Sequence, residues 1–271
     1  MRNCDCRKQR QSLKYKKIMS YSIRPLYFSH MYRHVPNPQE KVHAIVYDKC
    51  NFKCKFCTAH LRDKNEYKEY SEDEFIYVSS QLLLLGKSFK FTGGEPTLNK
   101  YILRDTKIVK DLGGFIYLDT NGSHPNIVQQ MIDMKTIDVL SISLKGLSKV
   151  DAAKTSNCKV ESLCWNNVLQ TIELGCNNGI TTIITYVINS LTNIYTLLDY
   201  VDIFESYNNI IFKFNNLFYQ NDKESGLIRK QENEFSFLIR ELLSMRPNLK
   251  NRIIVCDNEE SITNFSAHIY L

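Results

Sequence analysis

The sequence lacks the features that would place the protein in a membrane or mark it for export. It has no apolar run of about 18 residues, which excludes a transmembrane helix. Its N-terminus is basic, but no apolar segment follows, so a secretory signal peptide is not expected. Its nine cysteines are an odd number, which indicates reduced thiols rather than a disulfide framework. We therefore expect a cytoplasmic protein without a membrane partner.

Acidic residues are scarce at the start of the chain. The first 33 residues contain nine Lys and Arg side chains and one acid, Asp5, whereas the whole chain carries only +6. Charge-rich segments rarely pack by themselves, so we expect residues 1–40 to form a flexible basic extension, with a nucleic-acid arm or a dock for an acidic partner as the alternatives. A nucleic-acid partner is not our expectation for the protein. Cys4 and Cys6 are weak evidence for a metal site.

The rest of the chain, residues 41–271, has the length and apolar content of one large domain. Hydrophobic residues make up 43% of the 271-residue sequence, enough for a sizeable core. Short apolar segments, which we expect to be strands buried on both faces, lie at 43–47, 88–91, 115–118, 137–143, 181–187 and 210–214. Amphipathic segments, which we expect to be helices, alternate with them at 71–86, 98–112, 126–134, 160–174, 194–204 and 232–243.

Repeated strand-then-helix units imply parallel strands joined by right-handed crossovers. The pattern has six such units, fewer than the eight of a closed barrel. We therefore predict an α/β protein with a partial (β/α)6 barrel of parallel strands, open on one side, with a seventh strand optional at 252–256. Ser71 and Glu74 form a capping box at one helix start, and Gly86 and Gly175 are expected to end two helices.

Three cysteines follow the first predicted strand in the stretch Cys50-Asn-Phe-Lys-Cys54-Lys-Phe-Cys57. Thiolates this close together on one loop suit an iron–sulfur cluster. Such clusters usually take four protein ligands, so a set of three indicates either a missing partner or an iron left open for chemistry. A structural zinc site is the alternative, and His60 could supply its fourth ligand.

Chemically unusual segments also follow the next three predicted strands. They are Thr92-Gly93-Gly94-Glu95-Pro96, Asp119-Thr120-Asn121-Gly122 and Ser143-Leu144-Lys145-Gly146. In parallel barrels the functional groups gather at the carboxyl ends of the strands. We therefore expect these segments and the cysteine loop to meet at one mouth.

The cysteine loop, the FTGGEPTL segment at 91–98 and the strand order between them resemble the radical S-adenosylmethionine enzymes over about residues 43–215. The resemblance implies that Cys50, Cys54 and Cys57 hold three irons of a [4Fe-4S] cluster and that S-adenosylmethionine chelates the fourth. It further implies reductive cleavage of S-adenosylmethionine to methionine and a 5′-deoxyadenosyl radical, which abstracts hydrogen from a substrate.

The same resemblance assigns further residues to the cofactor. The segment of Thr92, Gly93, Gly94 and Glu95 matches the one that offers hydrogen-bond acceptors to the methionine ammonium. Its glycines would let the backbone approach a ligand closely. Phe56 matches the position whose backbone faces the adenine.

The stretch Asp119-Thr120-Asn121-Gly122-Ser123, followed by His124-Pro125, resembles the activases of glycyl radical enzymes, such as the activating enzymes of pyruvate formate-lyase and anaerobic ribonucleoside-triphosphate reductase. The resemblance implies that Asp119, Thr120 and Asn121 lie on the cofactor side. It also implies that Asp119 and Thr120 help to bind a monovalent cation.

Two positions depart from the activase pattern. Ser143 stands before Leu144-Lys145, where the activases have an Asp. A Ser at this place resembles the peptide-modifying and cofactor-building radical S-adenosylmethionine enzymes, in which the Ser can bond to the cofactor. Ile184 replaces an Arg before Thr185, and such an Arg would hold a carboxylate bidentately. We expect Lys145 to take over this charge at the cofactor and in catalysis.

The function that these residues favour is the generation of a glycyl radical on a protein. Modification of a peptide, nucleotide or small molecule is the alternative, and a non-catalytic metal-binding protein is the third reading. The expected partners are a protein or peptide substrate and an electron donor such as flavodoxin or ferredoxin. After residue 220 only Cys256 remains, so one cluster is expected; Cys158, Cys164 and Cys176 are expected outside the mouth, and Trp165 in packing.

Overall fold

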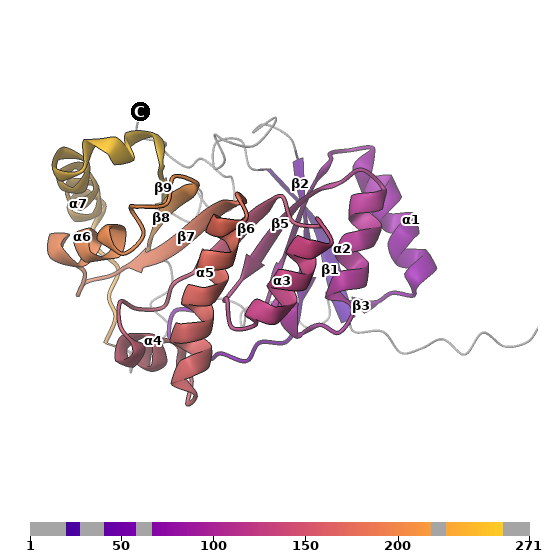
Figure 1. Ribbon diagram of the computed structural model, residues 1–271, viewed down its shortest axis with the longest axis horizontal. Helices are drawn as coiled ribbons and strands as arrows, with labels where there is room; N and C mark the ends of the chain where they lie inside the picture. The colour runs from indigo at the N-terminus through magenta and orange to yellow at the C-terminus, as the bar shows by residue number, and fades with distance from the viewer. Residues whose placement is uncertain (1–19, 28–40, 58–66, 218–225, 257–271) are drawn as a thin grey trace, which may run out of the picture.

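One nine-stranded sheet forms the centre of the fold in the computed structural model, which describes residues 20–27, 41–57, 67–217 and 226–256 (Figure 1). All the predicted strands are present, and the optional one at 252–256 is β9. The strands are β1 (Ser20–Tyr27), β2 (Lys41–Tyr47), β3 (Lys68–Glu69), β4 (Ser88–Gly93), β5 (Phe115–Thr120), β6 (Val139–Ser143), β7 (Thr181–Ile188), β8 (Ile210–Asn216) and β9 (Ile253–Cys256).

The sheet has the strand order β3-β1-β2-β4-β5-β6-β7-β8-β9. Strand β2 and strands β4 to β9 pair in parallel, whereas β1 pairs antiparallel with both β2 and β3. Within the described residues β3 and β9 are edge strands, so the sheet does not close. The predicted α/β class with a partial barrel of parallel strands is confirmed.

Helices connect the parallel strands in sequence, and Figure 1 shows α1, α2, α3 and α5 lying along the same side of the sheet. The helices are α1 (Glu72–Leu83), α2 (Ile102–Asp111), α3 (Pro125–Asp133), α4 (Lys149–Ser156), α5 (Asn167–Asn177), α6 (Ile194–Asp202) and α7 (Glu232–Met245). Helix α4 was not predicted, because its sequence KVDAAKTS has too few apolar residues to show a periodic pattern. A π-helical turn (Ser162–Asn166) precedes α5.

The two faces of the sheet differ in polarity. Phe89 and Phe91 of β4 belong to the main core under the helices, whereas Lys90 between them points to the opposite face. We call that opposite face the inner face. Toward the amino ends of the parallel strands this face is apolar and contains Val42, Tyr117, Val139, Ile183, Ile211 and Ile254. Toward their carboxyl ends it is polar, so the expectation of strands that are apolar on both faces is wrong there. The polar residues include Lys90, Thr92, Asp119, Ser141, Ser143, Thr185, Lys213 and Asn215.

The helix ends follow the predictions only in part. Ser71 and Glu74 form the expected capping box of α1. Gly86 does not adopt the left-handed conformation, and the helix ends at Leu83. Gly175 lies inside α5, where an added Cβ would be 2.5 Å from Thr182 Oγ1, so close packing and not chain reversal requires this glycine.

Part of the predicted N-terminal extension is regular structure. Strand β1 covers residues 20–27 and pairs with β2 along its whole length, which differs from the expectation of a chain without regular structure. The remainder of the extension, including Cys4 and Cys6, lies outside the described residues, as does His60. Among the helices that the structure describes, none has the length and apolarity needed to span a bilayer.

Candidate functional site

The cysteine loop leaves the carboxyl end of β2 and is held by backbone hydrogen bonds on two sides. On one side, Glu95 N donates to Lys49 O at 2.6 Å. On the other side, Lys53 N donates to Ser156 O at 2.9 Å, at the end of the unpredicted helix α4. The loop is therefore fixed between the end of β4 and helix α4.

Gly93 and Gly94 allow the end of β4 to lie against the start of this loop. A Cβ on Gly93 would be 2.3 Å from Tyr47 O, and Gly93 has a φ of +122°. A Cβ on Gly94 would be 2.2 Å from Lys49 O. These glycines thus permit two segments of protein backbone to lie close together. The predicted approach to a ligand stays a prediction.

Glu95 joins the ends of β4 and β5. Its side chain is buried, with 1% exposure. Oε1 accepts hydrogen bonds from Thr97 N (3.0 Å), Thr97 Oγ1 (2.5 Å) and Thr120 Oγ1 (2.6 Å), and Oε2 accepts from Asn121 N (2.6 Å). Both carboxylate oxygens are therefore engaged by the protein, which gives Glu95 and Thr120 a positioning role at these strand ends. Their contact with the cofactor stays a prediction.

Asn121 connects the β5–α3 loop to the cysteine loop. Its Nδ2 donates to Asn51 Oδ1 at 2.8 Å and lies 3.9 Å from Cys50 Sγ, while Asn51 Nδ2 donates to Ser123 Oγ at 2.9 Å. His124 Nδ1 lies 3.0 Å from both Ser123 Oγ and Thr97 Oγ1. No role was predicted for Asn51 or His124, because Asn121 and Thr97, which they contact, are remote from them in the chain.

The three thiols of the loop lie within electrostatic range of one another. Burial raises the pKa of Cys50, and the charges of Glu95, Cys54 and Cys57 raise it further. Burial also raises the pKa of Cys54, while the Lys145 ammonium opposes this shift. The donor set therefore consists of soft sulfur ligands grouped on one loop, which suits a cluster.

The described residues do not test the zinc alternative. In the described part of the chain, no three His, Cys, Asp or Glu side chains converge on a position suitable for one metal ion. His60, which could supply the fourth zinc ligand, lies outside the described residues. The iron–sulfur interpretation rests on the three grouped thiols and not on this absence.

Lys145 lies over the cysteine loop. Its Nζ donates to Ser143 Oγ at 2.6 Å and lies 5.1 Å from the centre of the Phe56 ring. This contact places the end of β6 beside Phe56, the residue that precedes Cys57. Ser143, Lys145 and Phe56, all predicted as site residues, therefore lie together.

Asp119 faces the inner side of the sheet and is paired with a protein cation. Its Oδ2 lies 3.0 Å from Lys90 Nζ and accepts from Thr92 Oγ1 at 2.8 Å, while Oδ1 accepts from Ser141 Oγ at 3.0 Å. Burial alone would raise the pKa of Asp119, but Lys90, Thr92 and the Lys213 charge outweigh it and hold the pKa at about 2. Asp119 is therefore paired with Lys90. The monovalent cation that the resemblance implies at Asp119 and Thr120 stays a prediction.

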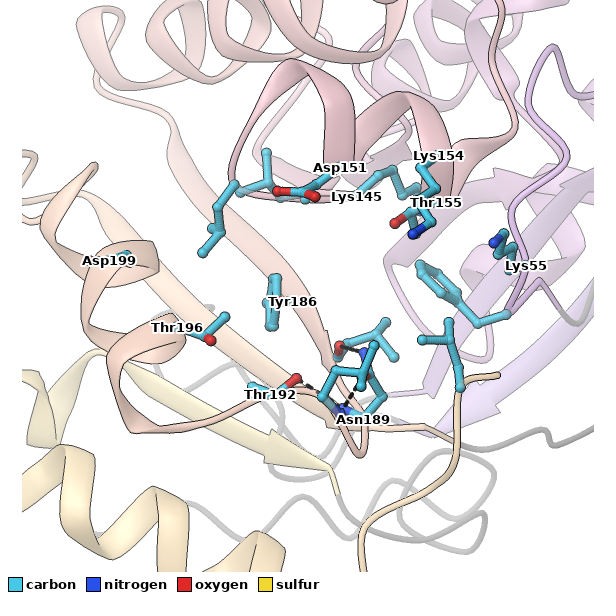
Figure 2. Close-up of a pocket in the computed structure, with 17 residues that line it drawn as sticks. Lys55, Lys145, Asp151, Lys154, Thr155, Tyr186, Asn189, Thr192, Thr196 and Asp199 are labelled. Carbon is cyan, nitrogen blue, oxygen red and sulfur yellow. Dashed lines mark hydrogen bonds between the residues drawn. The ribbon is translucent and has the colours of Figure 1, made fainter. Parts of the chain in front are cut away.

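A cavity of about 400 Å³ opens beside the cysteine loop (Figure 2). Lys55 and Phe56 of the loop line one side of it. Figure 2 shows Asp151, Lys154 and Thr155 projecting from α4, and Tyr186 standing at the end of β7. The remaining wall includes Lys145, Asn189, Thr192, Thr196 and Asp199. Three lysines and two aspartates leave a net positive charge around the cavity, which suits an anionic group.

One of the remaining cysteines lies closer to the loop than expected. Cys158 packs with Cys54, Phe52 and Cys164 in a small apolar cluster. Cys164 and Cys176 are buried, and Trp165 packs against the core. Cys158 was expected away from the mouth, but the bonds between α4 and the loop bring it near Cys54.

Comparison with curated proteins identifies relatives of several kinds, among them an activating enzyme and a nucleotide dehydratase. A protein of Methanocaldococcus jannaschii, provisionally named a glycyl-radical enzyme activating enzyme, is 33% identical over 97 residues, which cover 35% of this chain and 40% of the relative. An S-adenosylmethionine-dependent nucleotide dehydratase of Flammeovirga pacifica is 26% identical over 231 residues, which cover 81% of this chain and 76% of the relative. The chain spans less than half the length of the activating-enzyme relatives it matches.

Among solved structures, Streptococcus suis SuiB bound to its precursor peptide SuiA shares the fold, with a TM-score of 0.62 and 16% identity over 80% of this chain and 48% of SuiB. The Radical SAM superfamily model matches residues 44–198, more than half of the chain and all of the strand ends described above except that of β8. The chain therefore belongs to the radical SAM superfamily, whose enzymes use a [4Fe-4S] cluster and S-adenosylmethionine.

Proposed function

We propose that this enzyme abstracts a hydrogen atom from a protein substrate, in the manner of an activating enzyme that generates a glycyl radical. The observation that carries the radical chemistry is the meeting of the three-cysteine loop, Phe56 and Lys145 beside a cavity of about 400 Å³. The activating-enzyme relatives support a protein substrate, and we place the reaction in the reducing cytoplasm.

Cys50, Cys54 and Cys57 would hold the cluster, which together with S-adenosylmethionine supplies a 5′-deoxyadenosyl radical after one-electron reduction by a donor such as flavodoxin or ferredoxin. Lys145 provides a cation for the methionine carboxylate, in place of the arginine that Ile184 replaces. Ser143 orients the Lys145 ammonium through the hydrogen bond at 2.6 Å. Glu95 and Asn121 hold the loop in place through their bonds to neighbouring strand ends.

The test is anaerobic reconstitution with iron and sulfide, followed by measurement of 5′-deoxyadenosine after chemical reduction. We expect product from the wild type and almost none from Cys54→Ala. A candidate glycyl-radical protein added to the reaction should then show a radical signal by electron paramagnetic resonance. Absence of 5′-deoxyadenosine from the reconstituted wild type would refute the radical chemistry, and absence of a protein radical with every candidate would refute the activase role alone.

Nucleotide modification is the second candidate function. The dehydratase of F. pacifica aligns with 81% of this chain, and Lys55, Lys145 and Lys154 place three cations around the cavity. Incubation of the reduced holoenzyme with each nucleoside triphosphate, followed by mass spectrometry, tests it. A nucleotide product whose mass differs from the substrate, formed with stoichiometric consumption of S-adenosylmethionine, would favour this candidate over the activase.

A further inference from the structure

Lys213 in the middle of β8 is a buried lysine that forms no ion pair with any residue that the structure describes. It lies on the inner face and is 8% exposed. Within the described ranges, its ammonium group forms no ion pair and no hydrogen bond. Burial of an unpaired charge is unfavourable, so such a residue reduces the stability of the fold unless a ligand completes its surroundings.

The groups around Lys213 do not supply the missing negative charge. Asp119 is close enough for Lys213 to lower its pKa, but its carboxylate is already bound by Lys90 and by two hydroxyl groups. The Cys256 thiol is buried, which raises its pKa and favours the neutral form. Two lysines thus face one carboxylate, and this part of the inner face carries a net positive charge.

A second unsatisfied group lies next to Lys213 on the same face. Asn215 is two residues further along β8, so its side chain points to the same side of the sheet. Its Oδ1 atom is buried and has no hydrogen-bond partner among the described residues. An ammonium group without a described ion pair and an unsatisfied amide acceptor therefore lie at neighbouring positions, as expected where a ligand is bound.

The surroundings of Lys213 disfavour its charged form. Burial lowers its pKa and the Lys90 charge lowers it further, whereas Cys256 and Asp119 act in the opposite direction. An anion at this position would compensate for the burial.

The position of Lys213 relative to the proposed cofactor residues indicates what it would contact. Ser143, Thr185 and Lys213 are aligned in register across β6, β7 and β8. Adjacent strands are about 4.8 Å apart, so the backbones of Ser143 and Lys213 are roughly 10 Å apart. Lys145, which we assign to the cofactor, bonds to Ser143 at the near end of this row. Lys213 therefore lies across the inner face from the proposed cofactor position.

We propose that Lys213, with Lys90 beside it, binds an anionic group of the substrate that gives up hydrogen, and that Asn215 Oδ1 accepts a hydrogen bond from the same molecule. Lys213 would determine specificity and would not be a catalytic residue. The inference rests on the proposed radical chemistry and narrows the substrate to one with a carboxylate or phosphate near the reacting C–H bond.

Thermal unfolding of the anaerobic holoenzyme tests whether Lys213 is an unpaired charge. Lys213→Met should raise the melting temperature by about 2–4 °C, because it removes a buried charge that lacks a partner. Lys90→Met should lower the melting temperature, because it leaves the Asp119 carboxylate without its cation. The surface variant Lys107→Met serves as the control with little change. A decrease for Lys213→Met comparable to that of Lys90→Met would overturn the proposal.

Titration of the same proteins with pyrophosphate and with succinate tests anion binding. We expect one or both probes to raise the melting temperature of the wild type, and Lys213→Met to bind the active probe about 10- to 100-fold more weakly. A response to pyrophosphate alone identifies a phosphate group, and a response to succinate alone identifies a carboxylate. No response, or equal responses in wild type and Lys213→Met, would overturn the proposal.

A parallel titration with S-adenosylmethionine separates substrate from cofactor. If Lys213→Met weakens S-adenosylmethionine binding as much as it weakens probe binding, the lysine serves the cofactor and the proposal is overturned. Failure of the proposed function is a separate result, because it is measured as the absence of 5′-deoxyadenosine from the wild type.

Discussion

Asn121 of the β5–α3 loop donates a hydrogen bond to Asn51 of the cysteine loop at 2.8 Å, and the same Asn121 amide lies 3.9 Å from Cys50 Sγ. The two asparagines are 70 residues apart in the chain. Their contact couples the end of β5 to the loop that we assign to the cluster, so the loop conformation depends on the folding of the sheet.

Asn121→Ala should reduce cluster incorporation without unfolding the protein. The substitution removes the bond to Asn51 and leaves Asn51 partly unsatisfied, at a cost of about 1–3 kcal/mol. Iron content per protein after reconstitution is the measurement. Asn178→Ala, at the exposed end of α5, is the matched control and should retain normal iron. Equal iron content in both variants would contradict a role of the Asn121–Asn51 hydrogen bond in cluster incorporation.

Cys54→Ala should abolish cluster binding, because it removes one of three thiolate ligands. Iron content and the visible absorption of the reconstituted protein report the loss. Cys176→Ala is the control, since Cys176 is buried in the main core and remote from the loop. Normal absorption in Cys54→Ala would refute the assignment of the ligands.

Gly94→Ala should destabilise the fold more than Gly113→Ala. A methyl group on Gly94 would meet the Lys49 carbonyl at 2.2 Å, so the cysteine loop would have to move. Gly113 has no atom within 4 Å of an added Cβ, and its substitution costs only the left-handed conformation at φ +89°, about 1 kcal/mol. Denaturant unfolding of both variants measures the difference, and equal losses of stability would contradict the steric argument.

Lys145→Met should weaken S-adenosylmethionine binding about 10- to 100-fold, because it removes a charged hydrogen-bond donor from the proposed carboxylate position. Iron content should stay normal, since Lys145 is not a metal ligand. Calorimetric titration of the anaerobic holoenzyme measures the affinity. The exposed Lys149→Met variant should bind like the wild type. Unchanged affinity in Lys145→Met would remove this residue from the site.

Asp119→Asn should destabilise the protein at neutral pH by about 2 kcal/mol. This free energy corresponds to the fall of the Asp119 pKa from 3.8 in the unfolded chain to about 2 in the fold. A depressed carboxyl pKa stabilises the fold above the unfolded value, and this contribution is lost as the pH falls toward 2. The difference in the free energy of unfolding between wild type and variant should therefore shrink below about pH 4. A difference that stays constant from pH 7 to pH 3 would disagree with the depressed pKa.

Local patterns in the sequence were sufficient to predict the parallel strands and the cysteine loop, but not the antiparallel strands β1 and β3. The strands are apolar runs bounded by amphipathic helices, and each helix must pack on the sheet through its apolar side, so the alternation implies a parallel sheet. Cys50, Cys54 and Cys57 occupy one short loop, so their proximity needs no knowledge of the rest of the fold. The polar helix α4 was missed, because its position depends on contacts with the cysteine loop and not on its own periodicity.

Only the tertiary structure decided which polar groups are neutralised and which are not. Asp119 is paired with Lys90, and Glu95 is engaged by Thr97, Thr120 and Asn121, whereas Lys213 has no counter-ion among the described residues. In the sequence each of these is an ordinary charged residue in or after an apolar strand. Whether a charge stabilises or destabilises the fold depends on its burial and on the neighbours brought together across strands. Sequence spacing carries no information about those distances.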